Sequence, residues 1–279
     1  MLQSLRKPAL ALSVVLAILV SGCSGQVSKA VSTPNYTQVP QVIGIIGDFG
    51  VGNRHEGSVA HMVNGFKPDL LMSVGDNVYS NKGYQRLVGE YYKQPMIAAT
   101  GNHDYQNGIA NFDSFFNESE NTRTFIYQAD SGVDFFVIDS QAGLDSKAVL
   151  AEQKAWLIRS TSESTAKFKV VLFHHPSYSS GKHGSTKQYQ WDFASMGVDL
   201  VVNGHDHIYE RIQRAGLTFV VDGTGGAGLY NCRPTRVYGS KICLDSYFGA
   251  LFLYANASQL RGVYRTSAGD TLDTFTINK

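Results

Sequence analysis

The sequence has little cysteine, no excess of charge of one sign and no apolar run long enough to cross a membrane. Its 279 residues include 3 Cys, and no two of them have the close spacing of thiolate zinc sites. The formal net charge of +1 lacks the basic footprint of a nucleic-acid binder. No Gly-x-Ser-x-Gly turn occurs, which argues against a serine hydrolase. These absences exclude zinc fingers and iron–sulfur proteins, and they imply no nucleic-acid partner.

The first residues have the pattern of a secretory signal peptide. Met1–Lys7 carries two basic residues and no acid, and Ala9–Val20 is apolar apart from Ser13. This apolar core is shorter than the roughly 20 residues that a transmembrane helix needs. We therefore predict a cleaved signal peptide at residues 1–22 in preference to an uncleaved membrane anchor.

Val20-Ser21-Gly22-Cys23 resembles a bacterial lipobox. The resemblance implies cleavage before Cys23 and lipid on its sulfur, with each buried CH₂ contributing about 0.8 kcal/mol to anchoring. Ser24 follows, instead of the aspartate associated with inner-membrane retention. We therefore expect a lipoprotein of the bacterial cell envelope, anchored at the periplasmic face of the outer membrane, with the membrane as a partner through Cys23.

The mature chain is expected to be a tether followed by one large domain. Residues 23–40 are rich in Ser, Thr, Gln, Val and Pro, a composition typical of flexible linkers. Residues 41–279 are long enough to bury a substantial core. In an oxidising periplasm, Cys232 and Cys243 favour a disulfide over two buried free thiols.

From residue 41 onward, strands and helices alternate at first, and strands dominate the last part. Helical spacing of apolar residues predicts a helix through Val59 and Phe66, and another at 146–161 with Leu150 and Ile158 on its apolar side. A third helix is predicted at 187–195. The order predicts an α/β domain with mixed, largely buried sheets. Apolar runs predict strands at 42–46, 70–74, 96–99, 125–128, 133–138, 169–173, 198–202, 219–221, 250–254, 260–264 and 271–277.

Five polar clusters each follow one of the apolar runs. Active sites of α/β folds collect at the carboxyl ends of strands. Any one cluster could be a turn, a helix cap or a satisfied buried imidazole. Five in succession, four of them beside a glycine that lets the backbone turn sharply, favour one shared site. They are Gly47-Asp48-Phe49-Gly50, Gly75-Asp76-Asn77-Val78-Tyr79, Gly101-Asn102-His103-Asp104, Phe173-His174-His175-Pro176 and Asn203-Gly204-His205-Asp206-His207.

The clusters supply many potential metal ligands and no thiolate. Two carboxylates, one phenol, one amide oxygen and three imidazoles are too many for one tetrahedral zinc. A pair of metal ions about 3.5–4 Å apart could use them all, with one carboxylate shared. The candidate ligands are Asp48, Asp76, Tyr79, Asn102, His174, His205 and His207.

The ordered set GDFG, GDNVY, GNHD, FHHPSY and NGHDH resembles the calcineurin-like metallophosphoesterase superfamily. Tyr79, three residues after Asp76, and His183, nine residues after His174, are similar to the purple acid phosphatases of the small, tartrate-resistant type. The resemblance extends over nearly all of the chain from Val42 to Tyr264. It implies a four-layer αββα sandwich, in which mixed β-sheets pack face to face with helices on both outer faces.

The resemblance also assigns the site residues. It implies Fe(III) at a first site and a divalent Fe, Zn or Mn at a second, with Asp76 shared. His103 and His183 match histidines that bind phosphate oxygens and help to protonate the leaving group. His175 stands where the small type more often has an aromatic residue, and we interpret it as structural or substrate-facing. The implied first-site ligands are Asp48, Asp76, Tyr79 and His207, and the second-site ligands are Asp76, Asn102, His174 and His205.

The implied function is that of an acid phosphatase, a binuclear-metal enzyme that hydrolyses phosphate monoesters. In such a mechanism a metal-bound hydroxide attacks phosphorus in line, and a protonated histidine assists departure of the alkoxide. Two alternatives remain, namely a phosphodiesterase of the same superfamily and a non-catalytic surface-binding lipoprotein. The complete ligand set and the two flanking histidines argue against the binding protein.

Overall fold

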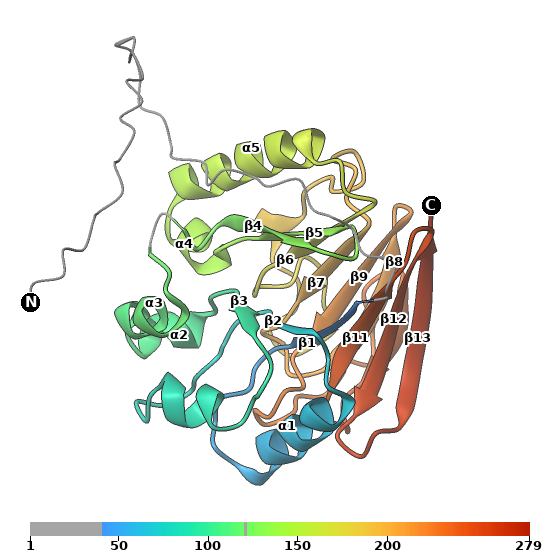
Figure 1. Cartoon of the computed structure of the whole chain (residues 1–279). Coiled ribbons are helices and arrows are strands. Elements are labelled where there is room, and N and C mark those ends of the chain that lie inside the picture. The colour runs from blue at the N-terminus through green and yellow to red at the C-terminus, as the bar shows by residue number, and fades with distance from the viewer. Residues whose placement is uncertain (1–40, 120–121) are drawn as a thin grey trace, which may run out of the picture. The chain divides into compact units, whose positions relative to one another are not determined.

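Two mixed β-sheets pack face to face, and helices cover both outer faces (Figure 1). The computed structural model describes residues 41–119 and 122–279. The expected signal peptide, the lipobox cysteine Cys23 and the tether lie outside the described residues. The four-layer αββα arrangement that the family resemblance implies is confirmed.

The first sheet has six strands in the order β13-β12-β11-β1-β2-β3. Strands β1, β2 and β3 are parallel, and β11 pairs antiparallel with β1. The carboxyl ends of the three parallel strands therefore share one edge of the sheet. The strands are β1 (Val42–Ile46), β2 (Leu70–Ser73), β3 (Met96–Ala98), β11 (Gly249–Ala255), β12 (Gln259–Thr266) and β13 (Thr271–Asn278).

The second sheet has seven strands in the order β10-β8-β9-β7-β6-β5-β4. Its central strands β5, β6, β7 and β9 are parallel. The strands β4 and β5 form an antiparallel pair at one edge of the sheet. The strands are β4 (Phe125–Ala129), β5 (Val133–Val137), β6 (Phe168–Leu172), β7 (Leu200–Asn203), β8 (Tyr209–Arg214), β9 (Leu217–Asp222) and β10 (Ser240–Leu244).

The alternation of side chains along each strand builds three layers of core. Ile43 and Ile45 of β1 pack between the two sheets, whereas Ile46 packs under the helices on the outer face. Strand β6 alternates in the same way, with Val170 in the central layer and Val171 under the helix of the opposite outer face. Burial on both faces explains why these strands read as continuous apolar runs.

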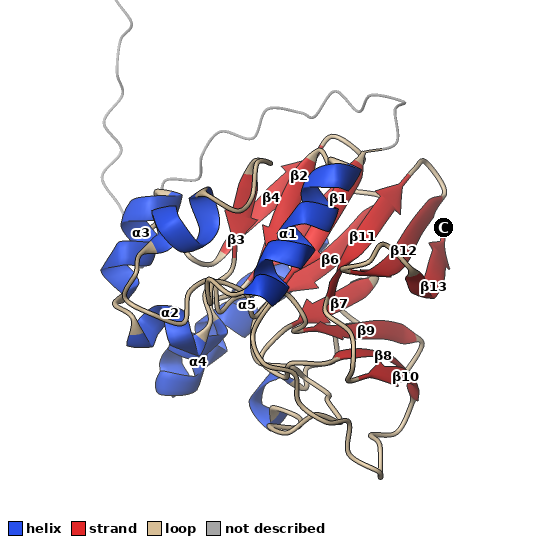
Figure 2. Ribbon diagram, turned by 90° about the horizontal axis from the view of Figure 1, so that it is seen from below, coloured by secondary structure: helices blue, strands red, loops and turns tan. Residues whose placement is uncertain are grey.

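The helix that follows β1 in the chain lies on the outer face of the first sheet (Figure 2). Helix α1 (Arg54–Phe66) starts at the side chain of Asn53, which accepts hydrogen bonds from the backbone N–H groups of His55 and Glu56. The remaining helical segments are the π-helical turn η1 (Gln85–Gly89), α2 (Asn102–Gln106), α3 (Ile109–Phe116), α4 (Ser140–Asp145), α5 (Lys147–Glu163) and the 3₁₀ turn η2 (Lys187–Tyr189).

Two details of the sequence-based assignment are wrong. Helix α5 buries Gln153 and Leu157, while Ile158 on the predicted apolar side is 48% exposed. Gln153 is inside because its side chain bonds the hydroxyl of Tyr189 and a backbone carbonyl. The predicted helix at 187–195 is only a single 3₁₀ turn. Its buried residues, Tyr189, Trp191 and Phe193, recur at every second position, which is the period of an extended chain.

Candidate metal centre

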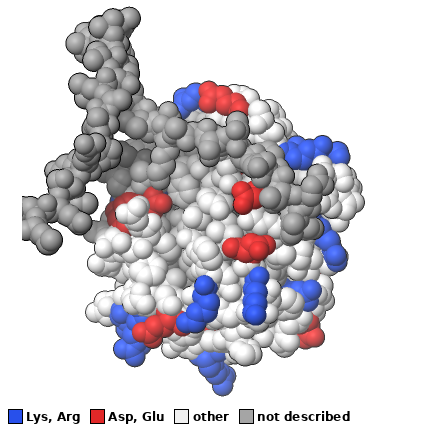
Figure 3. Space-filling model, in the orientation of Figure 1, with Lys and Arg blue, Asp and Glu red and all other residues white. Residues whose placement is uncertain are grey.

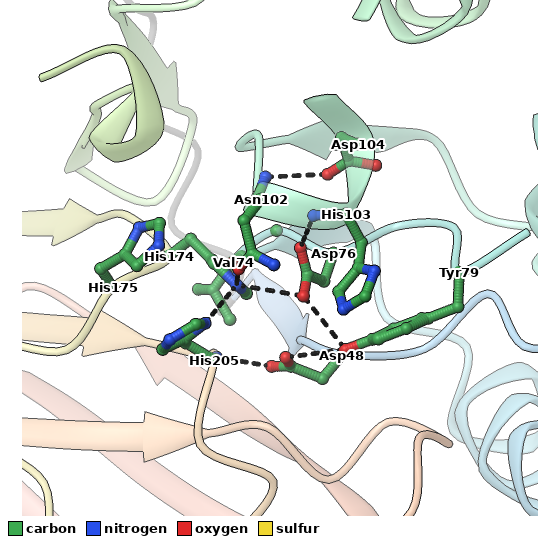
Figure 4. Close-up of polar contacts among 12 residues, drawn as sticks. Asp48, Val74, Asp76, Tyr79, Asn102, His103, Asp104, His174, His175 and His205 are labelled. Carbon is green, nitrogen blue, oxygen red and sulfur yellow. Dashed lines mark hydrogen bonds and ion pairs between the residues drawn. The ribbon is translucent and has the colours of Figure 1, made fainter. Parts of the chain in front are cut away.

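The seven candidate ligands converge where strands β1, β2, β3, β6 and β7 end. Figure 4 labels all of them except His207. They fall into two groups on either side of Asp76. We call Asp48, Tyr79 and His207 the tyrosine group, and Asn102, His174 and His205 the histidine group. Each group draws on both sheets, so the site exists only because the two sheets are packed together.

In the tyrosine group, one phenol oxygen contacts three other candidate ligands. The Tyr79 hydroxyl lies 3.0 Å from Asp48 Oδ1, 3.0 Å from His207 Nε2 and 3.2 Å from Asp76 Oδ2. His207 Nδ1 lies 2.7 Å from the carbonyl oxygen of Gly228. An N–H there donates to that carbonyl, which leaves Nε2 as the free ligand atom facing the group.

In the histidine group, one imidazole nitrogen has the same central position. His174 Nε2 lies 3.2 Å from Asp76 Oδ2, 3.2 Å from Asn102 Oδ1 and 3.2 Å from His205 Nδ1. His174 Nδ1 lies 2.9 Å from the carbonyl oxygen of Val74 and donates to it. Ligand atoms of Asp76, His174 and His205 all lie within 4.8 Å of one another. The Oδ2 atom of Asp76 is therefore shared between the two groups.

The backbone is strained at three of these positions. Asp48, Asp76 and His205 have positive φ angles of 56°, 52° and 69°. Such conformations cost on the order of 1–3 kcal/mol each and persist where the surroundings fix them, often at functional sites. Gly101 is needed for a related reason, since a Cβ there would overlap the Asp76 carboxylate. These backbone conformations lower the stability of the fold, and they direct the ligands toward one point.

Burial and mutual charge set the protonation of the cluster. Burial opposes the charged forms of Asp76 and His174, but their attraction for each other lowers the pKa of the carboxyl and raises that of the imidazole to about 9. Burial and the neighbouring imidazoles hold the pKa of His205 well below its usual value. Burial, then Asp48 and Asp76, raises the pKa of Tyr79.

These features fit cations in the cluster. Asp48 and Asp76 are almost fully buried, with 0% and 1% exposure, and such carboxylates need positive charge nearby. The phenol of Tyr79 ionises there only beside a highly charged ion. The donor set of carboxylate, phenol, amide and imidazole suits hard and borderline metals.

The two expected catalytic histidines flank the cluster at different groups. The backbone N–H of His103 donates to Asp76 Oδ1 at 2.8 Å, and its ring lies 4.2 Å from the Tyr79 ring. The exposed ring of His183 lies 4.3 Å from the ring of His205. His175 lies within 2.9 Å of the Ser140 hydroxyl through Nδ1. His174 is therefore the imidazole of the pair that reaches the Asp76 carboxylate.

Three buried acids that sequence reasoning left without a role hold the site loops. Asp206 accepts hydrogen bonds from the backbone N–H groups of His183 and Gly184. Asp104 accepts from the backbone N–H groups of Asn77 and Gly101. The third acid is Glu56, which accepts from the N–H groups of residues 50–52. Asp104 and Asp206 could have been identified from the sequence because they lie inside the site motifs. Glu56 lies outside the motifs, and no sequence feature marks it.

Comparison with known proteins gives a consistent result. Residues 42–209, which include all seven candidate ligands, match the calcineurin-like phosphoesterase family. Purple acid phosphatase 3 of Arabidopsis thaliana is 28% identical over 228 residues, which cover 65% of this chain and 62% of that protein. Purple acid phosphatase 7 of the same plant is 25% identical, covering 84% of this chain and 85% of that protein. The chain thus spans less than two thirds of the first of these relatives.

Solved structures share the fold. The purple acid phosphatase PPD1 from yellow lupin seeds aligns with a TM-score of 0.68 and 22% identity, covering 87% of this chain and 54% of that one. GAP50, described as the anchor in the inner membrane complex of Plasmodium, aligns with a TM-score of 0.73 and 17% identity, covering 86% of this chain and 89% of that one. Sequence, fold and ligand geometry agree, and the chain belongs to the calcineurin-like phosphoesterase family.

Proposed function

We propose that this phosphoesterase is a binuclear-metal phosphatase that hydrolyses phosphate monoesters in the manner of a purple acid phosphatase. The observation that carries the proposal is the position of Asp76. Its Oδ2 atom lies 3.2 Å from the Tyr79 hydroxyl on one side and 3.2 Å from His174 Nε2 on the other. One carboxylate between two ligand groups is what a pair of metal ions requires.

The chemistry of the two groups supports different ions. The tyrosine group, with a carboxylate and a phenol, suits Fe(III), and the histidine group suits a divalent Fe, Zn or Mn. When bound, the ions would lower the pKa of a water molecule and withdraw charge from the phosphate. The relatives named purple acid phosphatases support this assignment. Asp76 would be a ligand of both ions.

The residues of the chain would position the ester and move a proton. His103, beside Tyr79, and His183, beside His205, flank the cluster and can donate N–H groups to phosphate oxygens. The exposed ring of His183 can also give a proton to the leaving oxygen. The bonds from its backbone and from Gly184 to Asp206 keep that ring at the mouth of the site.

A turnover assay with two aryl esters tests the proposal. We expect hydrolysis of p-nitrophenyl phosphate to exceed that of bis(p-nitrophenyl) phosphate, with two metal ions per chain by elemental analysis. His205→Ala should lose one ion and the activity. His61→Ala is the matched control, because His61 is an exposed histidine of α1 outside the cluster. Preferred cleavage of the diester would indicate a phosphodiesterase, and metal binding without turnover of either ester a binding protein.

We also propose that lipid on Cys23 anchors the protein at the periplasmic face of the outer membrane. Within residues 41–119 and 122–279, no helix is long and apolar enough to cross a membrane. The Val20–Cys23 motif is the support for the anchor. Cys23→Ala should move the protein out of the membrane fraction or leave its signal uncut. Identical fractionation of variant and wild type, as soluble mature protein, would refute the anchor.

A further inference from the structure

A pocket of ≈ 470 Å³ lies beside the tyrosine group and has no role in the function proposed above. Its lining combines two cationic side chains with one aromatic ring and no carboxylate. The lining residues are Lys182, Leu229, Tyr230, Asn231 and Arg233. They come from the loop that carries His183 and from the long loop between β9 and β10. Figure 2 shows such long loops beside β8, β9 and β10.

Tyr230 forms the wall between this pocket and the metal cluster. Its ring stacks on the imidazole of His207, with centroids 4.1 Å apart and an interplanar angle of 11°. Its backbone N–H donates to the carbonyl oxygen of His207 at 3.0 Å. The His183 ring lies 5.4 Å away at its edge. A molecule bound at the cluster through its phosphate can therefore reach the pocket by passing one aromatic ring.

The same geometry places a group on each face of the Tyr230 ring. His207 covers one face of the ring, and the Lys182 ammonium lies 4.6 Å from the ring centroid. Because a stacked imidazole leaves no room on its own side, the ammonium covers the other face. A nucleobase or other planar ring would have to displace this ammonium in order to stack on Tyr230, so the geometry favours recognition of charge in this pocket.

Arg233 is held against the loop of His183. Its Nη2 donates to the carbonyl oxygen of Lys182 at 2.7 Å, and its backbone N–H donates to that of Ser180 at 2.8 Å. The guanidinium lies over Gly184, where φ is +77° and a Cβ would come within 3.1 Å of Nη1. One face of the pocket therefore carries a guanidinium with N–H groups left over for a ligand.

The loop that presents Arg233 is closed by covalent and polar links. Cys232 and Cys243 form a disulfide with a Cα–Cα distance of 6.3 Å. The backbone N–H of Cys232 donates to Asp245 Oδ2 at 3.0 Å, and that of Val237 donates to the Ser180 hydroxyl at 2.9 Å. These links reduce the entropy lost when the cations bind a ligand.

The positive charge of the pocket has no carboxylate partner. Among the residues that the structure describes, neither Lys182 nor Arg233 forms an ion pair with an acid. The face drawn in Figure 3 carries both signs of charge, scattered among uncharged residues. Two unpaired cations held beside a phosphate site favour a second anion on the same ligand.

We propose that Lys182 and Arg233 bind a second anionic group of the substrate, a phosphate or a carboxylate a few atoms from the ester that is hydrolysed. The inference rests on the proposed phosphatase function and narrows its substrate class to esters with two anionic groups. Arg233 supplies a planar fork that matches either anion, and Lys182 supplies a point charge. The scissile group remains at the metal cluster, and no further chemistry is required of the pocket.

Matched substrate pairs test the preference on the metal-loaded, full-length protein. Fructose 1,6-bisphosphate is compared with fructose 6-phosphate, and 3-phosphoglycerate with glycerol 3-phosphate, to separate a second phosphate from a carboxylate. In at least one pair, the wild type should have a KM about tenfold lower for the ester with two anionic groups. Lys182→Ala/Arg233→Ala should lose that difference, measured as the ratio of the two KM values within each pair, so that any common change in basal activity cancels. The expected difference is only about tenfold because exposed charge pairs are weak in water.

Charge-conserving variants and salt separate binding from structure. Lys182→Arg/Arg233→Lys should keep the preference, and Arg236→Ala, an exposed cation of the same loop outside the lining, should not change it. Raising the salt concentration should reduce the preference of the wild type, because exposed charges are screened within about 10 Å at 0.1 M. The inference would be overturned if the double variant changed KM equally for esters with one and with two anionic groups.

A binding measurement keeps the inference testable if no ester is hydrolysed. Methylenediphosphonate, compared with methylphosphonate by calorimetry, should bind the metal-loaded wild type about tenfold more tightly than the double variant, while methylphosphonate binds both alike. If the protein hydrolyses p-nitrophenyl phosphate but shows no preference for esters with two anionic groups, only the inference would be overturned. Absence of any turnover with a retained diphosphonate preference would overturn only the phosphatase function. Loss of both would overturn both.

Discussion

The two ligand groups meet at one carboxylate but differ in chemistry. The tyrosine group offers oxygen atoms that carry or can carry negative charge, from Asp48 and Tyr79, together with one imidazole. The histidine group offers an amide oxygen and two imidazoles. Burial and Asp48 raise the pKa of Tyr79, whereas burial and neighbouring imidazoles lower that of His205. Under the proposed function, all ligands of the first group would bind only a strongly charged ion, whereas the imidazole nitrogen of His205 would be free to bind a divalent ion.

The difference extends to the surroundings of each group. His103 and a buried carboxyl, Asp222, lie near the tyrosine group, whose Asp48 adds to the charge felt by Asp222. His183 and another buried carboxyl, Asp104, support the histidine side, since Asp104 binds the backbone of the Asn102 loop. Unequal ligand groups with separate supports should respond differently to substitution, which gives four tests.

The largest effect is expected where the two groups join. Asp76→Ala removes the shared oxygen, so both ions should be lost. Turnover should fall at least a thousandfold, because loss of a residue that only hydrogen-bonds a metal ligand already costs about 10–100-fold. Elemental analysis and p-nitrophenyl phosphate hydrolysis measure the two results. Glu90→Ala, an acid outside the site, is the control. Retained iron with normal activity in Asp76→Ala would remove the case for two ions.

The residues of this junction could be predicted from sequence because each follows an apolar strand. The continuous apolar runs located β1, β2, β3, β6 and β7, and the clusters behind them supplied all seven candidate ligands. What failed depends on tertiary contact. Gln153 is buried in α5 only because Tyr189 bonds it, and β8 was not separated from the loop after His207. Asp206 looked like a spacer between two histidines, since its bonds are to a loop far away in sequence.

The second test compares the flanking histidines. His183→Ala should leave both ions bound and slow alkyl phosphate esters by about 10²-fold, with a smaller effect on p-nitrophenyl phosphate, whose leaving group needs no proton. His103→Ala, beside the tyrosine group, should slow both esters alike. Steady-state kinetics with the two esters measures this. Equal slowing in His183→Ala would make that residue a phosphate ligand and not the acid.

Asp206→Asn sharpens the same comparison. The Asp206 carboxylate holds the backbone of His183 and Gly184, and His183 supplies the ring. The variant should therefore show the leaving-group dependence of His183→Ala in weaker form. Combined with His183→Ala, it should add little, because both changes act through one ring.

The third test addresses the ion of the tyrosine group. A phenolate bound to Fe(III) gives a visible charge-transfer band, so oxidised, iron-loaded protein should be violet or pink. Tyr79→Phe should bleach the band and lower activity by about tenfold while Asp48, Asp76 and His207 still hold iron. Tyr84→Phe is the matched control, because Tyr84 bonds Asp104 behind the site. Colourless wild type with confirmed Fe(III), or colour that survives in Tyr79→Phe, would show that Tyr79 is not a ligand.

The smallest effect concerns the carboxyls behind the two groups in metal-free protein. Burial, assisted by Asp48 and opposed by bonds from Leu251 and Thr224, raises the pKa of Asp222 from 3.8 to about 8. Burial and Asp76 raise that of Asp104 to about 7. Because the folded pKa is the higher one, the folded state binds the proton more tightly. The stabilisation from each neutral carboxyl is complete below about pH 4 and is lost as pH rises through the folded pKa.

Urea unfolding between pH 4 and 9 should reveal these carboxyls as differences from their neutral amide variants. The free energy of unfolding of wild type, relative to Asp222→Asn, should fall by on the order of 1–3 kcal/mol across this range and level off near pH 8. Relative to Asp104→Asn, it should level off about one pH unit lower. Metal loading should weaken the Asp222 effect, because a cation at Asp48 offsets the negative charge that helps to raise the pKa. Parallel curves for wild type and Asp222→Asn would mean that Asp222 is ionised in the folded protein, and the two ligand groups would then differ only in their ligands.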